Sequence, residues 1–196
     1  MRLEIKIPYS SDQILKIEKI LSLNKVIKKH HPDRIVNSIY FDNLDLDLAK
    51  DNIDGLSKRC KIRIRYYGDQ NSNCNLEIKK KINRFGLKKI FDLKNRIDQI
   101  NLIDLFSTKN DLYKSFIEDP YIEKFVVKDY LQPQIKVSYL REYYIFDKIR
   151  LTHDKKINYI PMNNDKNFTQ KKMIDNTNVL EIKFDYNDFK KAKMIL

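Results

Sequence analysis

Alternation of side chains with a period of two residues is the feature that most constrains how this chain folds. Residues 57–67 read SKRCKIRIRYY, so Arg59, Lys61, Arg63 and Arg65 alternate with small or apolar residues. This pattern predicts a β-strand, because successive side chains of a strand point to opposite faces. Like charges along one strand face repel each other. The strand therefore raises the question of what binds on that face.

The same alternation recurs along the chain and makes strands its main element. It predicts strands over residues 2–8, 34–43, 75–82, 85–93, 133–146, 148–154 and 178–186, with a further short strand at 157–162. Apolar side chains spaced three to four residues apart predict helices over 10–23, before Gly55, within an insertion at 94–131 and at 187–196. Because strands follow one another through short turns without βαβ alternation, we expect an antiparallel sheet or barrel.

Interruptions of the pattern mark the expected connections. Gly55 suits a turn that needs a positive φ, and a turn at Gly86 is expected to begin the strand over 85–93. Residues 163–176 are rich in Asn and Lys and are expected to form a loop. No linker divides the chain, so we expect a single domain over residues 1–196.

Composition narrows the class of partner. The net charge is +12 and the pI is about 9.5, which indicates an anionic partner: nucleic acid, an acidic membrane surface or a polyphosphate-like anion. Cys60 and Cys74 form no CxxC motif, so no zinc site or disulfide framework is predicted. A long apolar run and a secretory leader are both lacking, and a cytoplasmic protein is expected.

The alternate faces of the predicted strands share an excess of cations. One interpretation is an open sheet whose charged face lies in water, where such charges contribute little. The other is a closed barrel that holds a polyanion in its lumen, since the arginine fork matches phosphate oxygens. These faces carry eleven cations, Arg2, Lys6, Arg59, Lys61, Arg63, Arg65, Lys79, Lys81, Arg141, Arg150 and Lys183, against four carboxylates, Glu4, Glu77, Asp154 and Glu181.

Seven short segments carry a resemblance to a known family. In chain order they are RLEIK, SIYFDN, GLSKRCKIRIRYYG, NLEIKKK, YLREYY, IRLTHD and VLEIKF. On these segments, from residue 2 to about 186, the chain resembles the VTC domain, the polyphosphate polymerase branch of the triphosphate tunnel (CYTH-like) metalloenzymes. The resemblance implies an α+β fold in which eight antiparallel strands form a tunnel or barrel with helices packed outside. It also implies binding of ATP and polyphosphate with Mn²⁺ or Mg²⁺.

The resemblance implies site residues as well. Six cations match the catalytic positions of the family: Lys6, Arg63, Arg65, Lys79, Arg141 and Arg150. The same six are implied to bind substrate together with Lys88 (or its neighbour Lys89), Tyr139 and Lys183, and Glu181 is implied to bind the metal.

The implied reaction is transfer of the γ-phosphate of ATP to a growing polyphosphate chain. Arg2 stands where the triphosphatase relatives carry their first glutamate, which favours the polymerase branch. The Ser-Lys pair that the family carries near the tunnel mouth has no match in the last residues, FKKAKMIL. A binding module without turnover and a triphosphatase-type phosphohydrolase therefore stay open. Nucleic acid is least favoured, because no signature of a nucleic-acid-binding motif accompanies the tyrosines.

Overall fold

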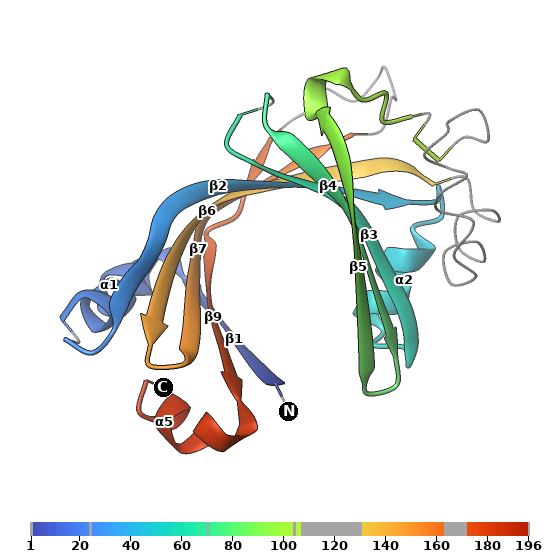
Figure 1. Ribbon diagram of the computed structural model, residues 1–196. Coiled ribbons are helices and arrows are strands. Elements are labelled where there is room, and N and C mark those ends of the chain that lie inside the picture. The colour runs from blue at the N-terminus through green and yellow to red at the C-terminus, as the bar shows by residue number, and fades with distance from the viewer. Residues whose placement is uncertain are drawn as a thin grey trace. The chain divides into compact units, whose positions relative to one another are not determined.

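The computed structural model describes residues 2–23, 25–69, 71–103, 105–106, 131–162 and 172–195 (Figure 1). Its strands are β1 Arg2–Ser10, β2 Lys28–Asp42, β3 Lys58–Tyr67, β4 Asn73–Ile82, β5 Phe85–Arg96, β6 Gln132–Phe146, β7 Ile149–Pro161, β8 Met173–Ile174 and β9 Thr177–Asp185. Its helices are α1 Ile14–Leu23, α2 Asp47–Ile53 and α5 Phe189–Lys193, and 3-10 turns span Ser11–Gln13, Ile97–Gln99 and Tyr186–Asp188.

The strands form one antiparallel sheet. Their order is β1-β9-β7-β6-β2-β3-β4-β5, and β8 pairs with β7. The predicted α+β class with an antiparallel sheet is thus confirmed. The structure differs from the expected barrel in one respect: the sheet is not closed, since no pairing between β1 and β5 occurs among the described residues. A sheet becomes a barrel only when its two edge strands hydrogen-bond to each other.

Several connections differ from the sequence-based expectation. The turn between β4 and β5 lies at Asn83, whose φ is +52°, while Gly86 lies inside β5 opposite Lys81. Asn tolerates this left-handed conformation better than most residues do, which is the reason that no glycine is needed there. The predicted strand at 157–162 is the continuation of β7. Gly55 has the expected positive φ of +69°.

Only part of the predicted helical insertion at 94–131 lies within the described residues. Its first residues belong to β5, because Arg96 still pairs with Asn73 of β4. A 3-10 turn follows and buries Ile97, and residues 104 and 107–130 lie outside the described residues. Most of the expected loop at 163–176 lies outside them too, and Met173–Ile174 form β8.

The described residues divide into two compact units. Unit 1 contains residues 1–36, 138–159 and 173–196, and unit 2 contains residues 37–137 and 160–172. The single domain expected over 1–196 stays a prediction.

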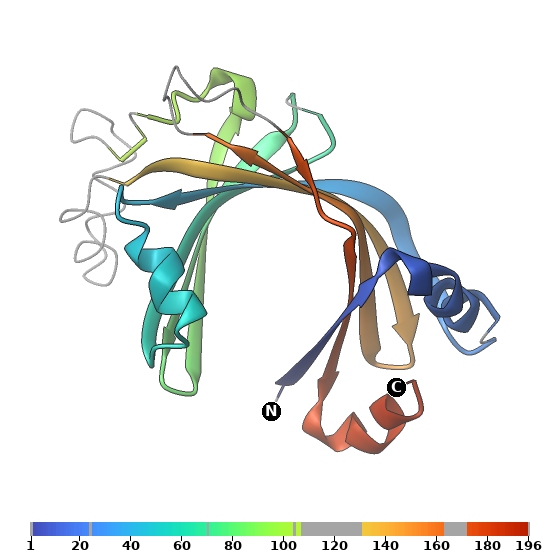
Figure 2. The ribbon, with the colours of Figure 1, turned by 180° about the vertical axis from the view of Figure 1, so that it is seen from behind.

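In unit 1, one sheet face is apolar and is covered by helices. β1 runs beside β9 in both views (Figures 1 and 2), with Ile5 opposite Ile182. Leu151 of β7 lies opposite Ile182 on the other side. Leu21 of α1 and Ala192 of α5 are buried in the same cluster. Burial of such side chains contributes about 1.5–3 kcal/mol each, and it leaves the alternate residues Glu4, Lys6, Glu181 and Lys183 on the opposite face.

In unit 2, the core lies beneath β3 and β4. Ile62, Ile64 and Leu76 are almost fully buried, and Ile62 pairs with Ile78 across the two strands. Helix α2 lies along β3 on this apolar side (Figure 1). Its first turn is held by Asp42, whose carboxylate accepts hydrogen bonds from the backbone N–H groups of Leu48 and Ala49. The alternate face of β3–β5 carries the cations.

Candidate anion-binding site

A cluster around Glu77 organises the cations of unit 2. Glu77 Oε2 accepts hydrogen bonds from Arg63 Nε at 2.8 Å and Nη2 at 2.6 Å, and Oε1 accepts one from Lys88 Nζ at 2.7 Å. Arg63 Nη1 also donates to the Tyr40 hydroxyl, and Arg65 Nε donates to Ser38 Oγ at 3.2 Å. We call these residues of β2–β5 the Glu77 cluster. Each arginine head is therefore fixed in place by protein groups.

Burial sets the electrostatics of this cluster. The side chains of Arg63 and Glu77 are only 22% and 9% exposed. Burial opposes the charge of Glu77, but Lys88 and Arg63 outweigh it and hold the pKa of Glu77 below its usual value. Burial opposes the charge of Arg63 too, while Tyr40 and Glu77 raise its pKa above the usual value. Both groups thus stay ionised near neutral pH.

Lysines lie next to this cluster in a row across three strands. Lys79 of β4 is the register partner of Lys61 on β3 and of Lys88 on β5. Lys79 is exposed, and no carboxylate lies within 4 Å of its amine in the part of the chain that the structure describes. The structure therefore brings together four of the expected site residues in unit 2: Arg63, Arg65, Lys79 and Lys88.

A second charged cluster lies on the strands of unit 1. Lys6 pairs in register with Glu181, and Glu4 pairs with Lys183. Lys6 Nζ lies 3.3 Å from Glu4 Oε1 and 3.6 Å from Glu181 Oε2. Lys183 Nζ forms an ion pair with Glu181 Oε1 and lies 3.7 Å from Glu4 Oε2. These four residues, the Glu181 cluster, alternate in charge, so each carboxylate is shared by the two lysines.

Glu181 has a buried oxygen, Oε1, whose partner is Lys183. Apart from this ion pair, no group among the described residues contacts Oε1 as a hydrogen-bond donor, and Oγ1 of Thr152 has no hydrogen-bond partner there. Thr152 is the register partner of Glu181 on β7, so the two groups are cross-strand neighbours. Burial opposes the charge of Glu181, but Lys183, Lys6 and Arg141 hold its pKa below the usual value.

The remaining expected site residues of unit 1 lie on β6 and β7. Arg141 forms a bidentate ion pair with Asp154. It also lies over the ring of Tyr139, with 5.2 Å between the guanidinium carbon and the ring centroid. Arg150 is exposed and pairs in register with Lys183, so two cations stand side by side. Lys6, Arg141, Arg150, Tyr139, Lys183 and Glu181 therefore share one face of unit 1.

The oxygens of the Glu181 cluster suit a divalent metal only in part. Hard cations such as Mg²⁺ and Mn²⁺ prefer carboxylate and phosphate oxygens. Glu181 and Glu4 offer carboxylates on one face, and both are shared with Lys6 and Lys183. No group of three or more His, Cys, Asp or Glu side chains converges among the described residues. The residues present fit a metal whose remaining ligands are phosphate oxygens.

A polar network lies on the helix-covered side of unit 1. His153 is fully buried and is hydrogen-bonded to the Tyr9 hydroxyl through Nε2 and to Glu142 through Nδ1. Lys155 Nζ donates to Glu18 of α1 and lies 2.9 Å from Glu142. Each of these groups has a partner, so the network holds α1 against the strands.

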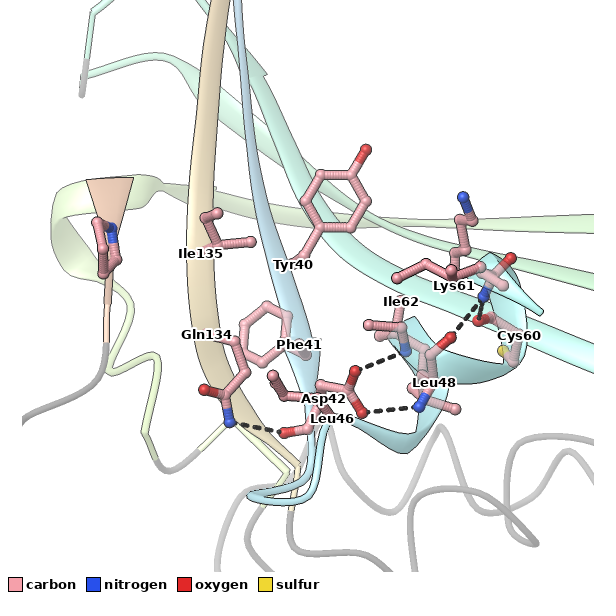
Figure 3. A pocket seen from close by; sticks show the side chains of 14 residues that line it. Tyr40, Phe41, Asp42, Leu46, Leu48, Cys60, Lys61, Ile62, Gln134 and Ile135 are labelled. Carbon is pink, nitrogen blue, oxygen red and sulfur yellow. Dashed lines mark hydrogen bonds between the residues drawn. The ribbon is translucent and has the colours of Figure 1, made fainter. Parts of the chain in front are cut away.

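A cavity of about 520 Å³ lies in unit 2 between α2 and strands β2, β3 and β6 (Figure 3). Its walls are mainly apolar, and its polar groups are already satisfied. Asp42 accepts from Leu48 and Ala49, and Asn52 donates to the carbonyl oxygens of Leu48 and Cys60. Because the cavity lacks arginine and contains one lysine, Lys61, it is a poor site for phosphate.

Sequence reasoning did not assign roles to Glu77 and Asp154. Glu77 holds Arg63 and Lys88, and Asp154 holds Arg141. The signal available in the sequence was the presence of these acids on the cation faces, but alternation cannot say which cation each one binds.

Among the helices of the described residues, none is both long and apolar enough to cross a membrane.

Comparison with known proteins places the chain in a family. A sequence model of the VTC domain matches residues 2–195. Comparison with curated protein sequences gives no match. The chain is similar to the structure of a putative adenylyl cyclase, HpAC1, from Hippeastrum, described as revealing a dominant triphosphatase activity. That match has a TM-score of 0.56 and 15% identity, and it covers 99% of this chain and 84% of the other.

Two further structures match with lower TM-scores. A chain of the Schizosaccharomyces pombe Mediator head module gives a TM-score of 0.51 with 8% identity, covering 100% of this chain and 94% of the other. A conserved hypothetical protein from Pyrococcus furiosus gives 0.46 with 14% identity, covering 100% and 85%. At such identities, the matches to the Hippeastrum and Schizosaccharomyces pombe chains show the fold alone.

Proposed function

Because this chain belongs to the VTC domain family, we propose that it binds the phosphate chains of ATP and polyphosphate and transfers the γ-phosphate of ATP to polyphosphate. The observation that carries this proposal is the fixed position of its cations. Arg63 and Arg141 are each held by a carboxylate through two hydrogen bonds. Cations held in place before the ligand arrives bind phosphate with little further ordering.

Both units contribute cations in this proposal. In unit 2, Arg63, Arg65 and Lys79 bind phosphate oxygens, and Lys88 supports them. In unit 1, Arg141, Arg150 and Lys183 do so, with Lys6 beside them and Tyr139 under Arg141. Arginine presents a planar fork to phosphate, whereas lysine acts as a point charge.

The proposed reaction is an in-line displacement at phosphorus. A terminal oxygen of the polyphosphate chain attacks the γ-phosphorus, the bond from that phosphorus to the β–γ bridging oxygen breaks, and ADP leaves with the oxygen and its electron pair. The cations stabilise the charge that develops on the phosphoryl oxygens. No covalent intermediate with the protein is needed.

A divalent cation, Mn²⁺ or Mg²⁺, is part of the proposal. When bound, such an ion neutralises phosphate charge and polarises the transferred group. Glu181 is the proposed ligand, with Glu4 as its neighbour, because the family resemblance implies Glu181 and both carboxylates lie on one face.

A binding module without turnover is the second candidate. Four carboxylates stand on the cation faces, Glu4, Glu77, Asp154 and Glu181, and each is engaged in an ion pair. A metal would have to compete with the lysines for Glu181. This observation favours tight binding of polyphosphate over fast metal-dependent chemistry.

One experiment separates these functions. The purified protein is incubated with ATP and Mn²⁺, and polyphosphate, ADP and phosphate are measured. Polyphosphate formed together with ADP supports the polymerase, and its loss in Glu181→Gln but not in Asp12→Asn supports the role of Glu181. Phosphate release alone indicates a triphosphatase, the activity named for the Hippeastrum protein. Thermal stabilisation by tripolyphosphate without turnover indicates the binding module, and absence of both contradicts the proposal.

A further inference from the structure

Helix α1 carries apolar side chains on two opposite sides. Ile14, Ile17 and Leu21 pack into the core of unit 1, and Leu21 is only 2% exposed. In contrast, Leu15 and Leu23 are 75% and 66% exposed. With about 3.6 residues in a turn, these two leucines lie on the same side of the helix, away from the core stripe. A helix that only covers a sheet needs one apolar stripe, so the second apolar side calls for a partner.

Lysines stand between the two exposed leucines. Lys19 lies midway between them on the same side of α1, and Lys16 lies beside it. Both lysines are exposed, and neither forms an ion pair with a carboxylate in the part of the chain that the structure describes. The single carboxylate of α1, Glu18, accepts a hydrogen bond of 2.8 Å from Lys155 of β7. The outward side of α1 is therefore apolar and cationic.

The chain that follows α1 continues this pattern. Val26 is 54% exposed, whereas its neighbour Ile27 is 7% exposed and belongs to the core of unit 1. Lys25 and Lys28 are exposed on either side of this pair. We call the outward residues of both segments the α1 patch: Leu15, Lys16, Lys19, Leu23, Lys25, Val26 and Lys28.

The α1 patch is fixed to the sheet from beneath. The buried stripe of α1 anchors the helix in the core, and Lys155 joins Glu18 of α1 to Glu142 of β6, which lies 2.9 Å from the same amine. The outward side chains thus stand on an element that is already folded. A partner that binds them need not order the helix first.

The mixture of side chains favours a lipid surface over a protein partner. Lysine is depleted in the buried centre of protein interfaces, where its amine would lose its hydration. At a bilayer surface the apolar side chains enter the boundary of the acyl chains, while the long lysine side chains reach the headgroup phosphates. Four lysines also complement the charge of an anionic leaflet. The acidic membrane surface that the net charge of +12 allows as a partner thus has a matching patch.

We propose that the α1 patch binds the surface of an anionic lipid bilayer. The contact is peripheral, with Leu15, Leu23 and Val26 in the acyl boundary and the four lysines at the headgroups. Because α1 covers the apolar face of the unit 1 sheet, the patch and the Glu181 cluster lie on different sides of that sheet. Lipid contact therefore leaves the cation face of unit 1 free, and the inference does not rest on the proposed function.

The test is flotation of the purified protein with vesicles. One set is phosphatidylcholine with about 30% phosphatidylserine, and the other is phosphatidylcholine alone. The parent should float with the anionic vesicles, less so at high salt, and bind the neutral vesicles only weakly. We expect Leu15→Gln/Leu23→Gln and Lys16→Gln/Lys19→Gln each to weaken binding to the anionic vesicles about tenfold.

Two matched control variants change the same residue types in unit 2. Leu44→Gln/Ile53→Gln removes two apolar side chains that are 82% and 83% exposed, and Lys50→Gln/Lys58→Gln removes two exposed lysines. Both controls should bind vesicles as the parent does. All four variants change exposed side chains, so the midpoint of urea unfolding should stay at the parent value and verify the fold.

Several results would overturn the inference. These are a parent that does not bind the anionic vesicles, α1 variants that bind them as the parent does, and equal losses in the α1 variants and their controls. Self-association of the parent that Leu15→Gln/Leu23→Gln abolishes, without vesicle binding, would assign the patch to a second copy of the chain instead. Calorimetry with tripolyphosphate tests the proposed function separately, because the α1 variants should bind this ligand as the parent does.

Discussion

Arg141 and Asp154 join β6 to β7 through two hydrogen bonds of 2.6 Å, from Nε to Oδ1 and from Nη2 to Oδ2. Their side chains are only 15% and 11% exposed. Burial opposes the charge of Arg141, but Asp154 outweighs it and raises the pKa of Arg141. The arginine head is thus held in one orientation by its own protein, and it requires no ligand to order it.

Removal of Arg141 should destabilise the fold as well as ligand binding. In Arg141→Gln, the carboxylate of Asp154 stays buried without its partner, and we expect a loss of about 3 kcal/mol in the free energy of unfolding. Urea unfolding measures it. The double variant Arg141→Met/Asp154→Leu should recover most of this loss, because no buried charge is left. A loss below about 1 kcal/mol in the single variant would show that Asp154 is solvated.

The Glu77→Gln variant tests whether phosphate binding depends on the fixed positions of the cations or on the net charge of the face. The substitution removes a negative charge from a cationic face, and charge alone predicts tighter binding of tripolyphosphate. We expect the opposite, a loss of about tenfold, because Arg63 and Lys88 lose the carboxylate that fixes them. Calorimetry measures the affinity. Asp92→Asn on β5 is the charge-matched control and should not weaken binding.

His153 should make stability depend on pH in the weakly acidic range. Burial lowers its pKa below the usual 6.5, although Glu142 opposes this effect. The unfolded chain then binds the proton more readily, so the contribution of His153 is complete above pH 6.5 and is lost as the pH falls toward the folded pKa. Between pH 7.5 and 5.5 we expect a loss of about 1 kcal/mol in urea unfolding. His153→Gln should show a flat profile over this interval, and an equal slope in both proteins would contradict the assignment.

The two cysteines should be inert in the folded protein. Cys60 and Cys74 are buried free thiols, and burial raises the pKa of each to about 11. Relative to an ordinary value of 9.0 the thiolate fraction falls about a hundredfold. Ellman's reagent should therefore react slowly with the native protein and rapidly with both thiols in guanidinium. Rapid labelling of the native protein would indicate that the strands open locally.

The strands were predictable because each carries its own signal. In β3, apolar Ile62 and Ile64 alternate with Arg63 and Arg65, and this alternation alone indicates an extended backbone with two different faces. The same reasoning predicted β1, β4, β7 and β9. It misplaced the β4–β5 turn, because Asn83 adopts the left-handed conformation that glycine was expected to supply. It also assigned residues 94–96 to a helix, since the pairing of Arg96 with Asn73 depends on a different strand.

By itself, the sequence determined that cations and apolar side chains take opposite faces of antiparallel strands, and that the chain resembles a family that handles phosphate chains. Only the tertiary structure decided which carboxylate holds which cation, that the sheet is not closed, and that Lys61, Lys79 and Lys88 form one row. The physical reason is that periodicity is a property of one strand, whereas register and ion pairing arise between strands far apart in the sequence. Glu77 and Lys88, or Asp154 and Arg141, become neighbours only when that register is set.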